Sequence, residues 1–185
     1  AFENCWNLAS ITIPNSVNSI KDKAFSGCHS LTSITLPNSV DSIGWGAFSD
    51  CCNLTSMTIQ NGITSIGKGS FVDCCSLTSI TIPGSVDLIG EDAFKGCEDL
   101  VCVIIDNGVT SIGEGAFYDC TSLTSVYCKA TTPPTGDYSM FSEDDYRYVS
   151  KPIGCKIYVP RNSVEAYKSA EGWKDYADDI VGYDF

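Results

Sequence analysis

A strict 23-residue repeat occupies most of this 185-residue chain and limits what it can fold into. Phenylalanine recurs at this interval six times: Phe2, Phe25, Phe48, Phe71, Phe94 and Phe117. A cysteine follows each phenylalanine three residues later and a leucine six residues later. Counted from Ala1, the unit is A-F-x-x-C-x-x-L-x-x-I-x-I-P-x-x-V-x-x-I-G-x-x, without insertion or deletion. A fixed period of this length is the signature of a solenoid, in which each unit forms one coil.

Each unit predicts one short strand and must stack on its neighbours, because only eight of its 23 positions are apolar. The segment L-x-x-I-x-I at positions 8 to 13 ends in an alternating stretch such as 33–36, with positions 11 and 13 facing the core. Positions 10 and 12 face outward and are mostly serine and threonine. We therefore expect a short parallel sheet whose outer side is rich in hydroxyl groups.

The rest of the unit predicts a return path for the chain. Positions 14 to 16 hold Pro-Asn, Pro-Gly or Asn-Gly pairs, which favour a turn. Valine and isoleucine at positions 17 and 20 predict a second, very short extended stretch on the opposite wall. Position 21 is glycine in most units, but Lys21 in the first unit predicts that this site accepts a side chain. The A-F-x-x-C segment has the spacing of one helical turn.

Whole units of the repeat resemble the BspA-like leucine-rich repeats, as in LTSITIPGSV (77–86) and IGEDAFKGC (89–97). The segments VYCKATTPPT, IYVPRNSVEAYKSAEGWKDY and IVGYDF resemble the C-terminal end of such proteins from gut Bacteroidetes. Repeat and resemblance together predict an α/β leucine-rich-repeat solenoid of 23-residue coils with a helical C-terminal cap. The resemblance also implies a bacterial cell-surface or secreted protein that binds other macromolecules, with adhesion to host matrix proteins or other cells proposed for some members. It brings no catalytic residues.

The chain divides into three predicted parts: six repeats over residues 1–129, a connecting loop over 130–156, and a partial seventh repeat with the cap over 157–185. Residues 157–160 repeat positions 11 to 14 and predict a seventh strand. Asn162 or Ser163 can then cap a short helix with Glu165 in its first turn. Large apolar residues of this segment are expected to cover the open end of the core: Tyr167, Trp173, Tyr176 and Ile180. A binding role for the loop Tyr138–Tyr148 is the other hypothesis for this region.

The N-terminal end of the repeat array has no cap in the sequence. Ala1 and Phe2 already begin a unit that matches the full pattern, and no preceding residue could cover its core. We therefore expect further repeats or a cap before residue 1 in the natural protein.

The 11 cysteines are the most conspicuous candidates for chemistry, yet six of them are one structural position counted six times. We predict that this position is a small buried hydrophobe with an inert thiol. Two alternatives stay open: a disulfide, mainly between Cys52 and Cys75, and a thiolate metal site. The sequence contains no C-x-x-C pair, so we predict no metal and no cofactor. Cys102 lies at an outward position and is expected to be more accessible.

The sequence offers little for catalysis. Its one histidine, His29, occupies a position that the repeat leaves variable, so we expect it on the surface. The acidic residues are scattered, and hydrolysis is a minor alternative to a protein that is not an enzyme. A net charge of −12 argues against nucleic acid as a partner. No apolar run approaches the roughly 20 residues of a membrane span.

The outer, concave side of the sheet is the expected binding surface, because solenoids commonly bind there. Repeats 1 to 4 present a hydroxyl surface, whereas repeats 5 and 6 break that pattern. The candidate ligand-binding residues are Ser79, Thr81, Cys102, Ile104, Asp106, Ser125, Tyr127 and Lys129. The predicted partner is a protein or another cell-surface macromolecule. The alternative is a structural spacer within a larger surface protein.

Overall fold

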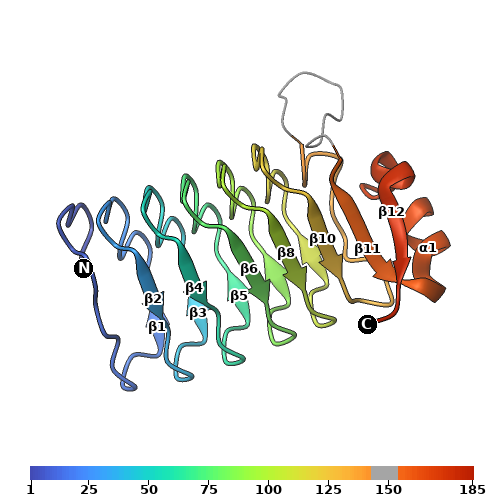
Figure 1. Ribbon diagram of the computed structural model, residues 1–185. Coiled ribbons are helices and arrows are strands. Elements are labelled where there is room, and N and C mark those ends of the chain that lie inside the picture. Colours follow the sequence, from blue (N-terminus) through green and yellow to red (C-terminus); the bar gives the residue numbers. More distant parts are fainter. Residues whose placement is uncertain (143–153) are drawn as a thin grey trace.

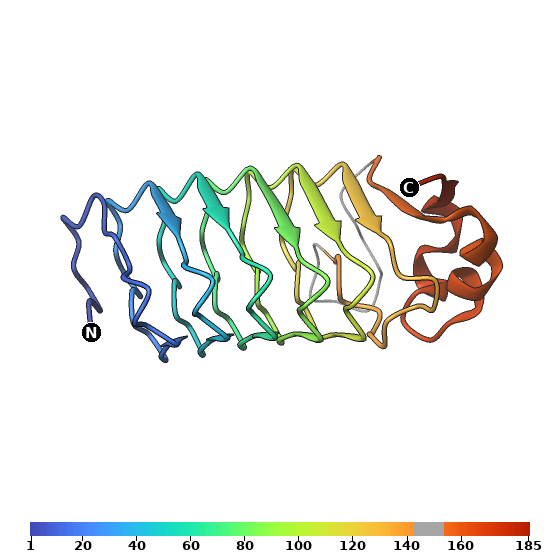
Figure 2. The same ribbon diagram turned by 90° about the horizontal axis from the view of Figure 1, so that it is seen from below.

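The structure, a computed structural model, describes residues 1–142 and 154–185. The chain winds into a parallel β-solenoid of about 7 coils of about 23 residues, with a short helix at its C-terminal end (Figure 1). The N-terminus lies at one end of the solenoid and the helical segment at the other (Figure 2). The predicted fold is confirmed.

Short parallel strands form two walls along the solenoid. The front wall contains β2 (Ser33–Thr35), β4 (Ser56–Thr58), β6 (Ser79–Ile82), β8 (Cys102–Ile105), β10 (Ser125–Cys128), β11 (Lys156–Pro160) and β12 (Ile180–Tyr183). The back wall contains β1 (Ser19–Ile20), β3 (Ser42–Ile43), β5 (Ser65–Ile66), β7 (Leu88–Ile89) and β9 (Ser111–Ile112). Within the coils a residue pairs with the same repeat position of the next coil, as Ser33 does with Ser56. In the coils of both walls, paired residues are therefore 23 residues apart, which is the period of the sequence.

The first coil differs from the predicted pattern. Within the described residues it has no strand at positions 10 to 13, and Ile11 and Ile13 are only half-buried. In the other coils the same positions are buried, as Ile34 and Leu36 are. Only one neighbouring coil of the described chain packs against the first coil, which leaves its front segment without a strand partner on one side.

A ladder of stacked phenylalanine rings runs through the core. From Phe2 to Phe117 the ring centroids of successive coils lie 5.0, 5.2 or 5.3 Å apart, and the planes differ by at most 7°. Phe141 extends the ladder, with its ring 5.5 Å from that of Phe117. Part of the segment predicted to be a connecting loop thus continues the coil. The hypothesis of a binding loop Tyr138–Tyr148 falls from residue 143 onward outside the described residues.

Two left-handed positions shape the turn that leads from the back wall to the front wall. Position 4 of each unit has positive φ, and the residues there are Asn4, Gly27, Asp50, Asp73, Gly96 and Asp119. Position 23 also has positive φ, and the residues there are Lys23, Gly46, Gly69, Asp92 and Gly115. Glycine, asparagine and aspartate tolerate this conformation best, which explains most of these choices. The A-F-x-x-C segment makes a single turn, closed by a hydrogen bond from the Cys28 amide to the Phe25 carbonyl.

Position 21 does not accept a side chain inside the solenoid, so the prediction drawn from Lys21 is wrong for the stacked coils. A Cβ atom on Gly67 would lie 2.7 Å from the carbonyl carbon of Gly44 in the preceding coil. The same contact with the preceding backbone recurs at Gly90, 2.7 Å from the carbonyl carbon of Gly67. Lys21 stands in the first coil, where no preceding coil of the described chain lies against it.

The C-terminal segment covers the end of the core as predicted. It comprises the 3-10 helix η1 (Arg161–Ser163), the helix α1 (Val164–Ser169) and the 3-10 helix η2 (Lys174–Asp179). Tyr167, Trp173 and Tyr176 are almost completely buried. Their polar atoms also find partners, because the Tyr167 hydroxyl donates to the Ala130 carbonyl at 2.8 Å and the Trp173 indole N–H to the Pro134 carbonyl at 2.7 Å.

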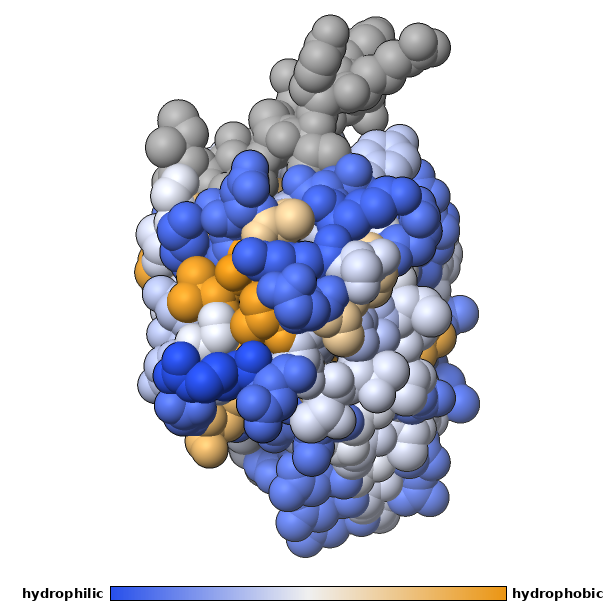
Figure 3. Space-filling view, turned by 90° about the vertical axis from the view of Figure 1, so that its right-hand side faces the viewer, coloured by the Kyte–Doolittle hydropathy of each residue, from blue (hydrophilic) through white to orange (hydrophobic). Residues whose placement is uncertain are grey.

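The helix begins where it was predicted, but not by the predicted contact. Ser163 is the N-cap residue of α1, yet its side chain makes no capping hydrogen bond. Because the 3-10 helix η1 leads directly into α1, the backbone already has a helical conformation before α1 begins. Figure 3 shows the outer surface of this end, which is mostly hydrophilic or of intermediate hydropathy, with a few small hydrophobic areas. The cap thus turns its apolar side toward the last coil and its polar side outward.

Candidate functional site

The predicted binding residues lie on the outer side of the front wall, in two rows across neighbouring strands. Ser79, Cys102 and Ser125 are register partners in one row. Thr81, Ile104 and Tyr127 are partners in the other row. Asp106 and Lys129 follow β8 and β10 and form an ion pair with 2.8 Å between the Lys129 Nζ and Asp106 Oδ1 atoms. The structure therefore brings these side chains onto one surface; whether that surface binds a ligand stays a prediction.

A cluster of four aromatic rings extends this surface toward the C-terminus. Tyr127 and Tyr158 stack with their ring centroids 4.6 Å apart. Tyr183 packs edge-on against both, at 5.6 and 5.7 Å, and Phe185 lies 5.1 Å from Tyr183. Val181 adds a further exposed apolar side chain on β12. We call Tyr127, Tyr158, Tyr183 and Phe185 the ring cluster.

The ring cluster is exposed although most large apolar residues of this chain are buried. Tyr183 is 43 % exposed and Phe185 is 52 % exposed. Loss of solvent around the Tyr127 hydroxyl, and then the nearby Tyr158, raise the pKa of Tyr127 above its ordinary value. The rings contact one another from three different strands and the chain end, which holds them in one arrangement.

Three ion pairs border the ring cluster, and in each pair the two opposite charges compensate each other. Besides Asp106 and Lys129, Lys156 pairs with Asp179 at 2.8 Å. Arg161 donates to both carboxylate oxygens of Asp184, at 3.0 and 2.8 Å, and this contact lowers the pKa of the Asp184 carboxyl. Exposed pairs of this kind contribute little to stability but fix the side chains at the rim of the surface.

Three of the four rings were absent from the prediction made from the sequence. Tyr158 occupies position 12 of the seventh strand, the same outward position as Tyr127, so strand alternation could have found it. Tyr183 and Phe185 reach the surface only because β12 pairs with β11. Ile180 lies 23 residues after Ile157, so the period could have marked this strand, but the segment between them departs from the repeat pattern.

The front wall of the earlier coils is a plain hydroxyl surface. Its outward residues on the three strands before β8 are exposed serines and threonines: Ser33, Thr35, Ser56, Thr58, Ser79 and Thr81. None of these side chains is an aromatic or charged anchor of the kind that dominates binding energy at protein interfaces. The ring cluster is therefore the distinctive part of the wall.

The repeated cysteine is a structural element of the core. The Cys51 thiol donates to the carbonyl oxygen of Phe25 in the preceding coil at 3.2 Å, and Cys74 makes the same contact with Phe48. Three other members of this ladder do the same: Cys28 to Phe2, Cys97 to Phe71 and Cys120 to Phe94. Burial raises the pKa of Cys51 to about 12, which keeps the thiol protonated and unreactive at neutral pH.

The predicted surface position of His29 is confirmed, because its side chain is exposed and lies beside the Trp6 ring, with centroids 6.4 Å apart. Cys52 and Cys75 carry free thiols and are half-buried. Among residues 1–142 and 154–185, no group of three or more histidine, cysteine or acidic side chains is arranged to hold a metal ion. In the same residues no helix is long and apolar enough to cross a membrane.

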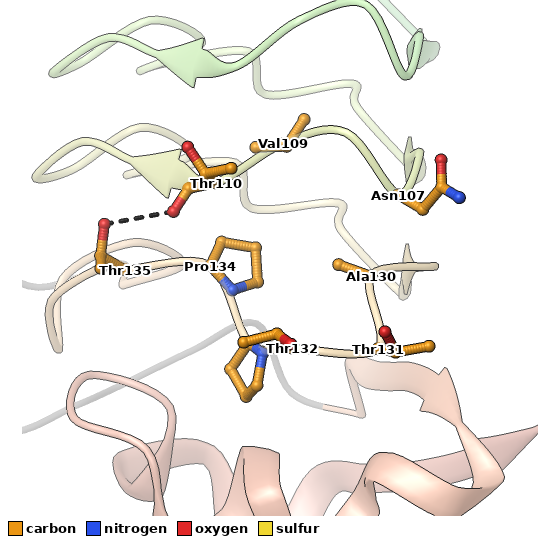
Figure 4. A pocket seen from close by; sticks show the side chains of 9 residues that line it. Asn107, Val109, Thr110, Ala130, Thr131, Thr132, Pro134 and Thr135 are labelled. Carbon is orange, nitrogen blue, oxygen red and sulfur yellow. Dashed lines mark hydrogen bonds between the residues drawn. The ribbon is translucent and has the colours of Figure 1, made fainter.

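A pocket forms where the repeat register breaks after the sixth coil (Figure 4). Its lining combines Asn107, Val109 and Thr110 with the segment 130–135. The Thr135 hydroxyl donates to the Thr110 carbonyl at 3.3 Å across one side of it. None of these residues is ionisable, so the lining offers no acid or base that could activate its threonine hydroxyls.

Comparison with solved structures places the chain among bacterial leucine-rich repeat proteins. A leucine-rich repeat protein from T. pallidum is 38 % identical, with a TM-score of 0.62. A leucine-rich cell surface protein from Faecalibacterium prausnitzii is 42 % identical, also with a TM-score of 0.62. Each match covers 64 % of this chain, which spans 58 % of the first protein and 31 % of the second. The pneumococcal vaccine antigen PcpA, 20 % identical, shares the fold over 96 % of this chain and 42 % of its own, with a TM-score of 0.72.

The search of curated proteins found no match. The family model described as the BspA type leucine rich repeat region matches in 6 copies, over residues 1–124 and 64–152. Proteins of this repeat class are commonly protein-interaction modules. The matched residues include strands β1 to β10, the ladders and the turns described above. The chain belongs to the BspA-type leucine-rich repeat family.

Proposed function

We propose that this chain is a non-enzymatic interaction module, at the cell surface or secreted, that binds a protein ligand in adhesion. The ring cluster and the adjoining outer residues of β8 and β10 form the binding surface. One observation carries the proposal: four aromatic rings gather on the outer side of a regular sheet and remain partly exposed. Exposed apolar patches with a polar rim mark interaction sites, and tyrosine is enriched among the residues that dominate binding energy.

The surroundings of the ring cluster support a protein ligand. The rings are large and already packed against one another, so they lose little conformational freedom on binding. The three ion pairs at the rim present both signs of charge, which favours a partner with its own mixed polar rim. The name of the Faecalibacterium relative as a cell surface protein supports the proposed location.

Two observations support a role without catalysis. The ladder thiols from Cys28 to Cys120 are buried and hydrogen-bonded to backbone carbonyls, and His29 is exposed at a variable position of the repeat. The acidic side chains for which the structure gives ion pairs contact lysine or arginine and are not paired with one another as acid and base.

A variant of an exposed ring of the cluster tests the proposal against a matched control. Tyr183→Ser removes a ring that is 43 % exposed in the ring cluster, and Leu88→Ser removes an equally exposed side chain, also 43 %, on the back wall. Binding of the purified chain to a panel of immobilised extracellular matrix proteins is measured for both. We expect at least one matrix protein to bind the unchanged chain, and Tyr183→Ser to weaken that binding by about tenfold or more, as for loss of a contact worth at least ~1.4 kcal/mol.

Leu88→Ser is expected to leave the affinity unchanged, because the back wall lies across the core from the ring cluster. Absence of binding to every member of the panel would favour the structural spacer instead. An equal loss of affinity in the two variants would place the ligand elsewhere on the molecule.

A further inference from the structure

A second hollow, of about 320 Å³, lies on the edge where the coils turn from the back wall toward the front wall. It crosses four successive coils and is separate from the ring cluster at the C-terminal end. Gly46, Gly69 and Val72 line it together with Trp45. Charged residues of both signs complete the lining: Lys23, Asp50, Lys68 and Asp92.

The hollow exists because two adjacent coils have glycine at the left-handed position 23. Lys23 and Asp92 occupy that position in the flanking coils with φ of 52° and 53°, whereas Gly46 and Gly69 occupy it between them with φ of 57° and 58°. All four backbones have the same conformation, but only the two glycines lack a side chain. A depression therefore opens between Lys23 at one end and Asp92 at the other.

Trp45 forms an exposed aromatic wall of this hollow. The residue is 49 % exposed, although tryptophan is usually well buried. The Lys23 ammonium lies over the ring, 4.5 Å from its centroid. The Trp45 amide donates to the Asp22 carboxylate in the preceding coil at 2.9 Å, which fixes the backbone that carries the ring.

The charges around the hollow balance each other. Lys68 pairs with Glu91 at 2.6 Å, and Asp92 lies 3.9 Å from Lys95. A ligand with a net charge of either sign would meet a like charge at this rim. A hydroxyl group, which both donates and accepts hydrogen bonds, can satisfy ammonium and carboxylate groups alike.

We propose that this hollow binds a neutral sugar in the pyranose form. The ring of such a sugar has a face of C–H groups, which can pack against the indole of Trp45, and an edge of hydroxyl groups, which can bond to Asp50, Asp92 and Lys68. Gly46 and Gly69 have no side chain, so the sugar ring can approach their backbone closely. The proposal concerns a site distinct from the ring cluster, so each can fail without the other.

Methyl glycosides of glucose, galactose, mannose and N-acetylglucosamine are suitable probes. Their binding to the full chain is measured by saturation-transfer difference NMR and by titration of tryptophan fluorescence, with glucuronic acid and glucosamine as charged comparisons. We expect at least one neutral glycoside to bind more tightly than both charged sugars. Trp45→Ala is expected to raise its dissociation constant by about tenfold or more, as for loss of an aromatic contact near the upper end of the usual range.

Two further variants separate the site from the fold. Gly46→Asn fills the hollow with a side chain whose Cβ atom would have ordinary contacts, 3.5 Å from Lys23 Cγ and 3.6 Å from Ser49 Oγ, and asparagine tolerates the left-handed backbone. It is expected to abolish binding while the thermal unfolding midpoint stays close to that of the unchanged chain. Trp6→Ala removes a tryptophan that is 64 % exposed outside the hollow, and it is expected to leave binding unchanged.

Failure of all four neutral glycosides to bind would overturn the proposal. Binding that survives Trp45→Ala or Gly46→Asn, or that is lost equally in Trp6→Ala, would also overturn it. Capture of an unglycosylated matrix protein that depends on Trp45, without sugar binding, would assign the hollow to a protein ligand instead.

Discussion

At the scale of single residues, the cysteine ladder shows how one repeated side chain stabilises a solenoid. From the second coil to the sixth, the ladder thiol fills a small apolar position and also donates to a phenylalanine carbonyl of the preceding coil. The sequence predicted the burial and the inert character of the thiols. It did not predict the hydrogen bond, because the partner is a backbone carbonyl 26 residues earlier that only stacking brings near.

Raised thiol pKa values predict a loss of stability in alkaline solution. Burial raises the pKa of Cys51 from 9.0 to about 12 and that of Cys128 to about 11. Above pH 9 the unfolded chain releases these protons while the folded chain retains them, so the free energy of unfolding must fall between pH 9 and about 11. Each such thiol contributes a slope of about 1.4 kcal/mol per pH unit.

Urea unfolding of the unchanged chain and of Cys51→Ala, measured from pH 8 to 11, tests this prediction. The variant has one buried thiol fewer, so its free energy of unfolding should fall less steeply by the contribution of one thiol. Equal slopes for the two chains would show that Cys51 does not titrate as its burial requires.

At the scale of elements, we expect the C-terminal cap to contain the single side chain that contributes most to the free energy of unfolding. Trp173 is fully buried and donates its indole N–H to the Pro134 carbonyl, so Trp173→Ala leaves both a cavity and an unpaired carbonyl. We predict that this variant lowers the free energy of unfolding by about 3–5 kcal/mol. Hydrogen exchange should become faster first in β11 and β12.

The exposed Trp6 provides the control for this variant. Trp6→Ala should change the free energy of unfolding by less than about 0.5 kcal/mol, because the residue is 64 % exposed. A similar small change for Trp173→Ala would mean that the cap does not hold the end of the core.

Most elements that keep the 23-residue period were predictable, and β12 is the exception. The front strands of coils 2 to 6, the back strands and β11 all follow from repeat positions. Phe141 continues the phenylalanine ladder 24 residues after Phe117, one residue out of step, and only packing shows its role. β12 pairs with β11 at the same 23-residue step, as Ile180 does with Ile157, but α1 and η2 replace the rest of the coil between them, so this strand was not predicted.

At the scale of the whole molecule, the ring cluster joins residues that are far apart in the sequence. Tyr127 belongs to the sixth repeat, Tyr158 to the seventh strand, and Tyr183 and Phe185 to the last residues of the chain. The sequence therefore indicated which end of the sheet is distinctive but yielded only one of the four rings. The apolar positions that recur in nearly every repeat form the core of the solenoid. The residues that depart from the repeat pattern form the ring cluster.

The most direct test of the proposed binding surface is hydrogen exchange, measured by mass spectrometry, with and without the matrix protein that binds most tightly. The account predicts slower exchange in β10, β11 and β12 on binding, and unchanged exchange in the back-wall strands β3, β5 and β7. Protection confined to the back wall, or to the hydroxyl surface of β2 and β4, would contradict it.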